Sequence, residues 1–553
     1  MSELRLVPAA LAVWLASLAC ILSGARAAAA AVACLAVACC AARQWGQAVL
    51  VALLGSASAA VALVRLRVAR TWVFPHRVVG EVSGQPKQLQ SGAWLVRLRV
   101  EGYPSTLSVF ADDLPAGAVP GAGVEATGRL RPSTFPGVSR EVLTGTVEVT
   151  DSPRGLAAFA QHVRSTFGES VAAHTGPASR GLIPGMVLGD TSAQTAAEQQ
   201  AYVDTGLSHL SAVSGANVAI VTTFAVVAAT AMRLGLRARL ATAAAALLGF
   251  AALVGPEPSV LRASVTGLVG LIAVVSTRRA EPLHALCLSV IVLVLVDSDL
   301  AVHYGFALSV AATAGIVALY PLLYRALAPT GWPDILVRAL AVAVAADVVT
   351  MPIVALMAGR VSLVSVLANV LVAPVTAAVT VLGLTAAALS LAPGGLEAPL
   401  LALIEPLTWW VHKVAVVGAG LPVATISATP AAVAVCYGWV LAGLFAHRPR
   451  LTAGAVAAVL AVGQVQLPQA PLMDISSLRA HVVATRADIE PVPPGTQLVV
   501  VLEAGSPTKR PTVTPAGIPV VFPNRDGPVL LRTDGTREIY DGPHAQPRPP
   551  RPG

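Results

Sequence analysis

Long apolar runs separated by short polar breaks dominate this chain. Three runs open it, at Val7–Ser23, Ala27–Ala42 and Ala48–Val64, and apolar segments resume from residue 210 to residue 465. About 20 consecutive apolar residues cross a bilayer as a helix. The pattern therefore predicts a polytopic α-helical membrane protein with about 12–13 apolar spans, some of them re-entrant or broken.

A different pattern interrupts the apolar runs between residues 73 and 150. Here β-forming residues alternate or cluster, and Gly, Pro, Asp and Ser break them into short segments: Val78–Ser83, Trp94–Val100, Leu107–Phe110 and Val124–Leu130. About five short strands in a segment of this length predict a small inserted OB-like β-domain.

Four arginines fall on these predicted strands at alternate positions. Arg97 and Arg99 form one pair, and Arg129 and Arg131 form the other. Residues two apart on a strand point to the same side, so each pair shares a face. Such a face could bind a polyanion such as DNA, or it could simply be solvated.

The segment that follows, residues 155–205, is predicted to form amphipathic, interfacial helices. Its apolar run Leu182–Leu188 is too short to cross a membrane and indicates an interfacial or re-entrant element. Gly181, Gly185 and Gly189 recur every fourth residue, where another backbone could approach closely. Thr191 followed by Gln194 has the form of a capping box and predicts a helix running towards Tyr202.

These boundaries divide the chain into five parts. The predicted domains are a transmembrane anchor of about three spans (1–68), the β-domain (73–150), the interfacial helices (155–205), a polytopic domain (206–466) and a soluble tail with a disordered end (467–553). Strand-like pieces of the tail lie at 497–502, 517–522 and 528–532.

Composition narrows the class of protein. Only 12% of the residues are charged and 55% are hydrophobic, whereas soluble domains carry about 25% charged residues. This excludes an ordinary cytosolic protein. The six cysteines lie in apolar runs without CxxC spacing, and no HxHxDH or HExxH motif occurs, so we expect no metal site and no cofactor.

Arginines in the loops bear on orientation. Arg233, Arg237 and Arg239 crowd one loop and Arg278 and Arg279 another; both loops should be cytoplasmic by the positive-inside tendency. With three N-terminal spans and a cytoplasmic N-terminus, this predicts a β-domain outside the cytoplasm. Arg65, Arg67 and Arg70 after the third run favour the opposite orientation.

Polar residues at membrane depth are costly and mark functional sites. One cluster, at residues 206–217, contains His209, Ser211, Ser214, Gly215 and Asn217. It could line a wet cavity or join helices by hydrogen bonds.

A second cluster, at residues 255–262, contains Glu257 and Arg262. Arg262 could extend to the headgroups, pair with Glu257, or face an anion. His303, Asp347 and Asn369 continue the series on later spans, and together these residues suggest a polar path among the helices.

The pair Ser214 and His209 also invites comparison with an intramembrane hydrolase. Residues five apart on a helix differ by about 140° in direction, so the two side chains would not share a face. We therefore expect no catalytic residues and no enzyme activity, and the hydrolase remains a remote alternative.

The order of the motifs resembles the ComEC-type competence protein family. The resemblance rests on residues 185–190 (GMVLGD), 205–217 (TGLSHLSAVSGAN), 258–263 (PSVLRA), 304–309 (YGFALS) and 363–374, where Asn369 precedes Pro374. It implies an inner-membrane channel for DNA uptake in natural transformation, preceded by an OB-like domain. Two departures stand out: the family usually has His where this chain has Asn217, and the tail lacks the metallo-β-lactamase-like domain of many members.

The resemblance implies a function and a set of partners. We expect import of single-stranded DNA through the bilayer, helped by a DNA-receptor protein with a helix-hairpin-helix, a separate nuclease, a cytoplasmic ATPase and further copies of the chain; a small-molecule or lipid transporter is the alternative. The lining or motif candidates are Gly189, Asp190, His209, Ser211, Ser214, Gly215, Asn217, Glu257, Arg262 and Asn369. The DNA-contact candidates are Arg97, Arg99, Arg129 and Arg131.

Overall fold

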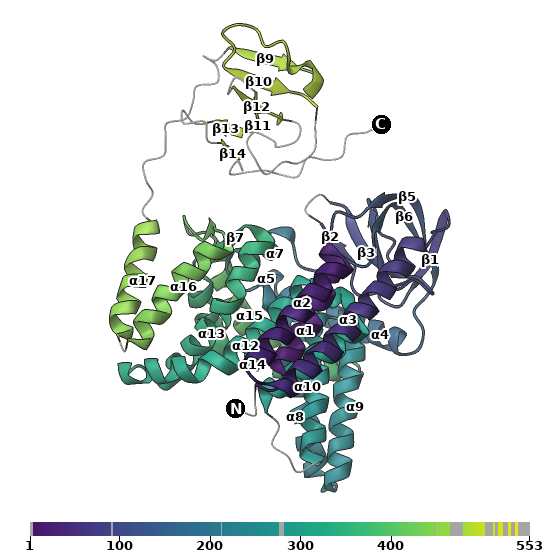
Figure 1. Ribbon diagram of the computed structural model, residues 1–553, viewed down its shortest axis with the longest axis vertical. Coiled ribbons are helices and arrows are strands. Elements are labelled where there is room, and N and C mark those ends of the chain that lie inside the picture. The colour runs from purple at the N-terminus through teal and green to yellow at the C-terminus, as the bar shows by residue number, and fades with distance from the viewer. Residues whose placement is uncertain are drawn as a thin grey trace. The chain divides into compact units, whose positions relative to one another are not determined.

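The computed structural model is mostly helical, with a β-barrel near the N-terminus (Figure 1). It describes residues 4–89, 92–211, 213–275, 281–446, 448–464, 479–503, 512–514, 518–523, 529–531 and 537–539. Arg278 and Arg279, and the predicted disordered end of the tail, lie outside these residues. The chain divides into two compact units, Met1–Gln464 and Val465–Gly553, close to the boundary expected at residue 466.

The first unit opens with three helices that pack against one another. They are α1 (Val7–Ser23), α2 (Ala25–Ala41) and α3 (Trp45–Thr71). Ser17 and Ser58, both fully buried, share a hydrogen bond of 2.7 Å between α1 and α3. Small residues and paired hydroxyls allow such helices to pack closely within a bilayer.

The β-domain is a closed barrel. Its strands are β1 (Arg77–Val82), β2 (Lys87–Gln88), β3 (Trp94–Arg99), β4 (Thr106–Ala111), β5 (Gly123–Pro132) and β6 (Glu141–Asp151). They follow the order β1-β5-β6-β4-β3-β2, a further pairing of β1 with β3 closes the ring, and β4 pairs with β6 in parallel. Alternate residues such as Val96, Val109 and Leu143 fill the interior.

Polar contacts attach the barrel to the helices. Asp299 accepts hydrogen bonds from the Ser105 hydroxyl (2.8 Å) and the Val138 amide (2.7 Å) of the barrel. Arg65 of α3 lies 3.4 Å from the same carboxylate and 2.7 Å from Asp297. Burial raises the pKa of Asp299 above its ordinary value, although the two hydrogen bonds and Arg65 act against this.

Four short helices connect the barrel to the larger helical part: α4 (Gly155–His174), α5 (Pro177–Arg180), α6 (Leu182–Leu188) and α7 (Ala196–Asp204). All seven residues of α6 are buried, so this helix is enclosed by protein and is not an amphipathic interfacial helix as predicted. Its core neighbours include residues of α4 and of two later helices, α14 and α15. Helix α4 does have the expected single buried face.

The predicted capping box was placed one turn too early. Helix α7 begins after Thr195, whose hydroxyl accepts from the Glu198 amide while the Glu198 carboxylate accepts from the Thr195 amide. Gln194 is buried, and its side-chain amide donates instead to the Gly181 carbonyl. Residues 190–194 therefore belong to the turn between α6 and α7, and α7 packs against α15 (Ala398–Ala419).

The remaining helical part contains the expected apolar helices. They are α8 (Gly215–Ala231), α9 (Leu236–Val254), α10 (Pro258–Val275), α11 (Pro282–Val296), α12 (Tyr304–Leu327), α13 (Asp334–Ala358), α14 (Ser365–Leu389), α15 (Ala398–Ala419), α16 (Pro430–Phe445) and α17 (Pro449–Gln464). Between them lie the 3₁₀ helices η1 (Ser208–Ser211), η2 (Ser298–Val302) and η3 (Ala328–Thr330) and the paired strands β7 (Arg360–Ser362) and β8 (Thr425–Ser427).

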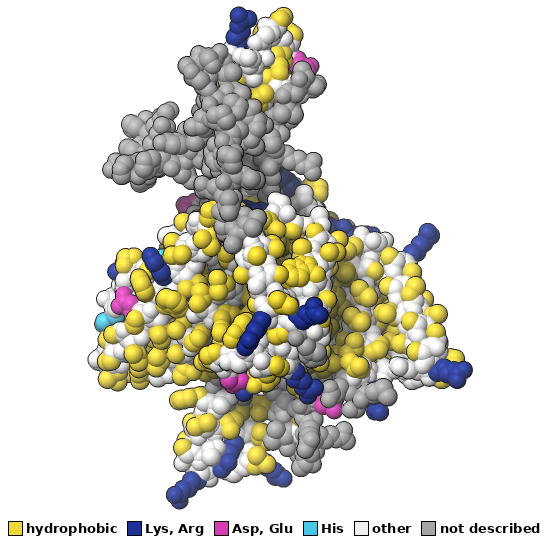
Figure 2. Space-filling model, turned by 90° about the vertical axis from the view of Figure 1, so that its left-hand side faces the viewer, with side chains coloured by type: hydrophobic (Ala, Val, Ile, Leu, Met, Phe, Trp, Pro, Cys, Tyr) yellow, Lys and Arg dark blue, Asp and Glu magenta, His cyan; other side chains and the backbone are white. Residues whose placement is uncertain are grey.

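The number of helices able to cross a membrane is smaller than the 12–13 expected. Within the described residues, six are long and apolar enough: α3, α9, α13, α14, α15 and α12 with its extension to Thr330. Others, such as α1 and α8, have only 17 residues and reach about 25 Å at 1.5 Å per residue, short of the ~30 Å hydrocarbon core. Hydrophobic side chains cover much of the helical surface seen in Figure 2.

The second unit is a small β-structure. It contains β9 (Ala480–Val483), η5 (Arg486–Ile489), β10 (Leu498–Val501), β11 (Thr512–Val513), β12 (Pro519–Val521), β13 (Val529–Leu531) and β14 (Arg537–Ile539). The sheet order is β11-β12-β10-β9, with β10 parallel to both β9 and β12. Strands lie in all three segments of the tail where they were predicted.

Candidate functional site

The candidate site forms where the beginnings of α8, α10 and α12 meet α6. Helices α8 and α10 begin at Gly215 and Pro258, next to the polar residues Ser214 and Ser259, so polar groups gather at these helix ends. The Asn217 side-chain amide donates to the Met186 carbonyl at 2.7 Å, and the Ser214 hydroxyl donates to Asn217 Oδ1 at 3.0 Å. Asn217 is therefore a buried joint between α6 and α8.

A second joint connects α10 to the segment before α8. The Ser259 hydroxyl donates to the Val213 carbonyl at 2.8 Å. The αL turn at Gly189 (φ +73°) packs against the same Val213, where a Cβ on the glycine would lie 3.2 Å from the valine side chain. Residues 185–190, 205–217 and 258–263 therefore converge.

Arg262 occupies the centre of this convergence. It is 7% exposed, and its Nε donates to the Ser309 hydroxyl of α12 at 2.9 Å. A terminal guanidinium nitrogen lies beside Gly215, the first residue of α8, where an added Cβ would be 3.3 Å away. Among the described residues, no carboxylate lies within ion-pair distance of it.

This arrangement leaves a positive charge without a protein counter-ion. An isolated buried charge is costly unless it is paired, and the start of α8 adds the partial positive charge of a helix N-terminus. Of the three alternatives for Arg262, pairing with Glu257 is not formed: Glu257 lies in the turn before α10 and acts electrostatically on His303 instead. The geometry suits an anion beside Arg262.

A second polar cluster lies where α13, α14 and α16 meet. Asp347 of α13, 6% exposed, accepts from the Ser365 hydroxyl of α14 (2.9 Å) and from the Tyr437 hydroxyl of α16. Asn369 donates to the Ser365 carbonyl at 2.9 Å. Gly206 (φ +70°) abuts Ser365, since an added Cβ would lie 2.5 Å from its hydroxyl oxygen. The motif at 205–217 thus contacts both clusters.

The remaining candidates of this region lie around the first cluster. Ser211 accepts from the Gln194 side-chain amide at 3.1 Å, and this amide also covers Gly181 and Gly185, so the glycines do permit a close approach. His209 is exposed, with Nδ1 3.1 Å from the Gly206 carbonyl oxygen. Asp190 is half-buried, and its carboxylate accepts from the Ser192 amide at 3.0 Å.

All four barrel arginines lie on the outer surface of the barrel, as two pairs on β3 and β5. Strand pairing places Arg97 opposite Ser108, Ser108 opposite Val142, and Val142 opposite Arg131, so Arg97 and Arg131 share one row on the outside of the barrel. Arg99 and Arg129 lie two residues away on the same outer surface.

Arg97, on the outer surface of the barrel, lies near enough to the helical part for its charge to act on His303. His303, at the start of α12, has its pKa lowered, chiefly by burial and next by the positive charge of Arg97, with a smaller contribution from Lys87. Its acidic neighbours Glu257 and Asp297 act in the opposite direction.

Some members of the site were not singled out from the sequence. Ser309 and Ser365 belong to recognised motifs, and Ser365 precedes Asn369 by one helical turn. Tyr437 and the Met186 carbonyl carry no sequence signal. The described residues contain no group of three or more His, Cys, Asp or Glu side chains placed to hold a metal ion.

Comparison with known proteins gives one match. Residues 186–450 match the model of a family described as "Competence protein". No curated protein and no solved structure matches the chain. The matched region begins in α6, ends in α17, and contains both polar clusters.

Proposed function

We propose that the chain is a multi-pass membrane channel of the ComEC type, because residues 186–450 match the family model described as "Competence protein". It passes single-stranded DNA into the cell during natural transformation. The six helices long enough to cross a bilayer support the membrane assignment. The chain contributes a conduit and no chemistry, so it is not an enzyme.

The observation that carries this proposal is Arg262, a buried cation without a described carboxylate partner, set where four family motifs converge. Single-stranded DNA brings one phosphate per nucleotide, and a conduit needs contacts that are weak and repeated. A guanidinium beside a helix N-terminus is a favourable place for a passing phosphate. Ser309 holds the guanidinium by one nitrogen and leaves the others free.

The barrel supports the same function as a collecting surface. Its five-stranded closed form is OB-like, and OB barrels bind oligonucleotides on the face of their second and third strands. Counting the long strands only, these are β3 and β4, and Arg97 and Arg99 lie on the outer face of β3. We propose that this face delivers the strand towards His303 and the turn before α10.

The orientation of the chain in the membrane is inferred from the positions of the barrel and of the basic α8–α9 hairpin. The α8–α9 hairpin, whose turn and second helix carry Arg233, Arg237 and Arg239, projects away from the barrel (Figure 1). Basic loops favour the cytoplasmic side, so we propose that the barrel lies outside, in the bacterial plasma membrane. A helix-hairpin-helix receptor, a separate nuclease and a cytoplasmic ATPase would complete the pathway, and the channel could act as a homo-oligomer.

The test uses a naturally transformable host that lacks its own channel gene. Labelled duplex DNA is supplied, and the DNase-resistant label inside the cells is counted after complementation with this chain. We expect uptake with the wild type and an uptake reduced at least about tenfold with Arg262→Gln, because a charged hydrogen-bonding group is worth about 1.5–3 kcal/mol.

The matched control is Arg338→Gln, an exposed arginine at the start of α13 that pairs with Asp334. It should leave uptake unchanged, with both variants present in the membrane in equal amount. No uptake with the wild type, or equal uptake with Arg262→Gln, would contradict the channel.

One observation favours the alternative of a small-molecule or lipid transporter. Asp347 is a buried acid with hydroxyl partners and no described cation beside it, and intramembrane acids commonly serve ion-coupled transport. Under this alternative, Asp347→Asn would abolish solute transport by reconstituted vesicles, while DNA uptake would be absent even with the wild type.

A further inference from the structure

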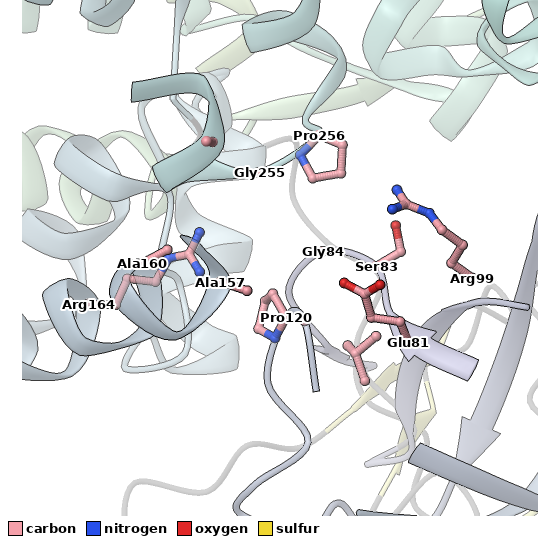
Figure 3. A pocket seen from close by; sticks show the side chains of 13 residues that line it. Glu81, Ser83, Gly84, Arg99, Pro120, Ala157, Ala160, Arg164, Gly255 and Pro256 are labelled. Atoms are coloured by element: carbon pink, nitrogen blue, oxygen red, sulfur yellow. The ribbon is translucent and has the colours of Figure 1, made fainter. Parts of the chain in front are cut away.

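A cavity of about 150 Å³ lies between the barrel and the helical part, away from Arg262. Figure 3 shows its walls: Glu81, Ser83 and Arg99 on the side of the barrel, and Ala157, Ala160 and Arg164 of α4 on the other side. Gly255 and Pro256, in the turn between α9 and α10, close it from a third direction. The cavity is thus built from three parts of one compact unit.

Close packing fixes the two sides relative to each other. Gly121 of the barrel lies directly against α4: an added Cβ would be 2.4 Å from the Ala157 Cβ. Its φ of +84° is also one that favours glycine. The barrel and α4 are therefore in contact beside the cavity, and the opening has a defined width.

Arg164 supplies a built cationic wall. It is 5% exposed, and one terminal nitrogen donates to the Leu253 and Val254 carbonyls (2.6 and 2.8 Å) at the end of α9. Its Nε is buried and has no hydrogen-bond partner. Burial lowers its pKa, and the charge of Asp190 opposes this only in part. Arg164 also lines the cavity, so its positive charge acts on a ligand bound there.

The opposite wall carries both signs of charge. Glu81 and Arg99 face each other across β1 and β3, yet no ion pair joins their side chains. A ligand for this cavity must therefore offer an anionic group to the arginines and a cationic group to Glu81. A bare phosphodiester would meet repulsion from the carboxylate, and the described lining includes no aromatic ring on which a base could stack.

The location indicates where such a ligand comes from. The cavity lies at the end of α9, one of the helices able to cross a bilayer, so it lies at the depth of lipid headgroups. The same helix α4 that lines it also exposes Leu156 (73%) and Phe159 (55%). Exposed apolar side chains on an amphipathic helix are typical of contact with the acyl region beside a headgroup.

We propose that this cavity binds the zwitterionic headgroup of a phosphoethanolamine phospholipid. The phosphate lies between Arg99 and Arg164, and the ammonium group lies beside Glu81. The bound lipid fills the junction between barrel and helices. This inference does not depend on what the channel transports.

The experiment measures binding to the full-length chain purified in a mild detergent. Water-soluble short-chain phosphatidylethanolamine, phosphatidylcholine and phosphatidylglycerol are titrated separately, as are inorganic phosphate and oligothymidylate, and the thermal unfolding of the protein is followed. Phosphatidylethanolamine should bind best, because it alone offers both a phosphate and N–H donors for Glu81.

Two exposed residues provide variants that should fold. Arg99→Gln should weaken phosphatidylethanolamine binding about tenfold, the effect of losing one charged hydrogen bond. Glu81→Gln should reverse the preference, so that anionic phosphatidylglycerol binds more tightly than phosphatidylethanolamine. Arg97→Gln, a neighbour on the same strand that does not line the cavity, should change neither affinity.

The opposite results would overturn the proposal. One is a lipid preference that Glu81→Gln leaves unchanged. Another is a loss of lipid binding with Arg97→Gln as large as that with Arg99→Gln, because surface charge alone would then explain the binding. Inorganic phosphate binding as tightly as the lipid would make this a free-phosphate site. Oligothymidylate displacing the lipid in an Arg99-dependent way would assign the cavity to the nucleic-acid path.

Discussion

The side-chain amide of Asn217 donates a hydrogen bond of 2.7 Å to the backbone carbonyl oxygen of Met186. The same amide accepts from Ser214, so both of its functions are used. Helices α6 and α8 are therefore joined by a side chain at the position where the family that the sequence resembles usually has His. A neutral imidazole has one donor and one acceptor, which is enough for the two hydrogen bonds that Asn217 makes here.

Removing this joint should destabilise the fold. Asn217→Leu leaves the buried Met186 carbonyl unpaired, which costs about 1–3 kcal/mol, whereas Asn217→His should lose less because an imidazole N–H can donate to the same oxygen. The measurement is the unfolding midpoint in detergent. Thr230→Ala, an exposed site on the same helix, is the control; a leucine variant as stable as this control would contradict the joint.

Ser309→Ala should impair transport more than stability. Without its hydroxyl, Arg262 loses the only described hydrogen bond that fixes the direction of its guanidinium. We expect DNase-resistant DNA uptake to fall by up to about tenfold while the protein level stays the same. Thr313→Ala, one turn later on α12, should leave uptake unchanged. If both alanine variants take up DNA equally well, Ser309 does not position Arg262.

The stability of the folded protein should depend on pH through Asp299, which joins the barrel to the helices. Burial raises its pKa in the folded protein above the ordinary value of 3.8, so the folded state holds its proton to higher pH than the unfolded state. By linkage, stability from this group is greatest below pH 3.8 and falls as the pH rises through that value up to the raised folded pKa. Above that pKa the loss is complete.

This dependence can be isolated with Asp299→Asn, which does not titrate. The stability of the wild type minus that of the variant should decrease over this window and be level above it, measured as unfolding midpoints in detergent from pH 3.5 to pH 7. Asp112→Asn, an exposed barrel residue, should give a flat difference. A difference that rises with pH would mean that the pKa of Asp299 is lowered instead.

Gly206→Ala should disturb both polar clusters. A left-handed backbone costs a non-glycine residue about 1–2 kcal/mol, and here the new methyl group would lie 2.5 Å from the Ser365 hydroxyl oxygen. We expect a lower unfolding midpoint and a loss of DNA uptake. Gly235→Ala, where nothing lies within 4 Å and φ is −67°, should behave like the wild type. An equal effect of the two substitutions would refute the close contact.

The sequence predicted the helices well because an apolar run is a local signal. It predicted 12–13 apolar spans; among the described residues six helices are long and apolar enough to cross a membrane, and others, such as α8 after the break at Ser214, are shorter apolar helices. It predicted about five strands in the barrel but did not delimit β6, whose residues 141–151 contain three threonines and one glycine among the apolar positions. Strand pairing with β5 and β4, not local composition, makes this segment a strand.

The sequence named candidate residues but not the contacts between them. Pairing with Glu257, five residues away, was one of three alternatives for Arg262; its described partner is Ser309, 47 residues away on another helix. Asp347 likewise bonds Tyr437, 90 residues later. Such partners are set by helix packing, which a single sequence does not encode locally. The motifs indicated which segments matter, and the packing decides which side chains meet.

The enclosure of α6 has a consequence for how the protein is made. Its seven buried residues pack against α14 and α15, which are synthesised nearly two hundred residues later. At 5–20 residues per second this is a delay of roughly 10–40 s. During that time a short apolar helix, too short to remain in the bilayer alone, has α4 as a partner but lacks α14 and α15. Insertion of this chain should therefore depend on a membrane chaperone or insertase that shelters α6 until the later helices arrive.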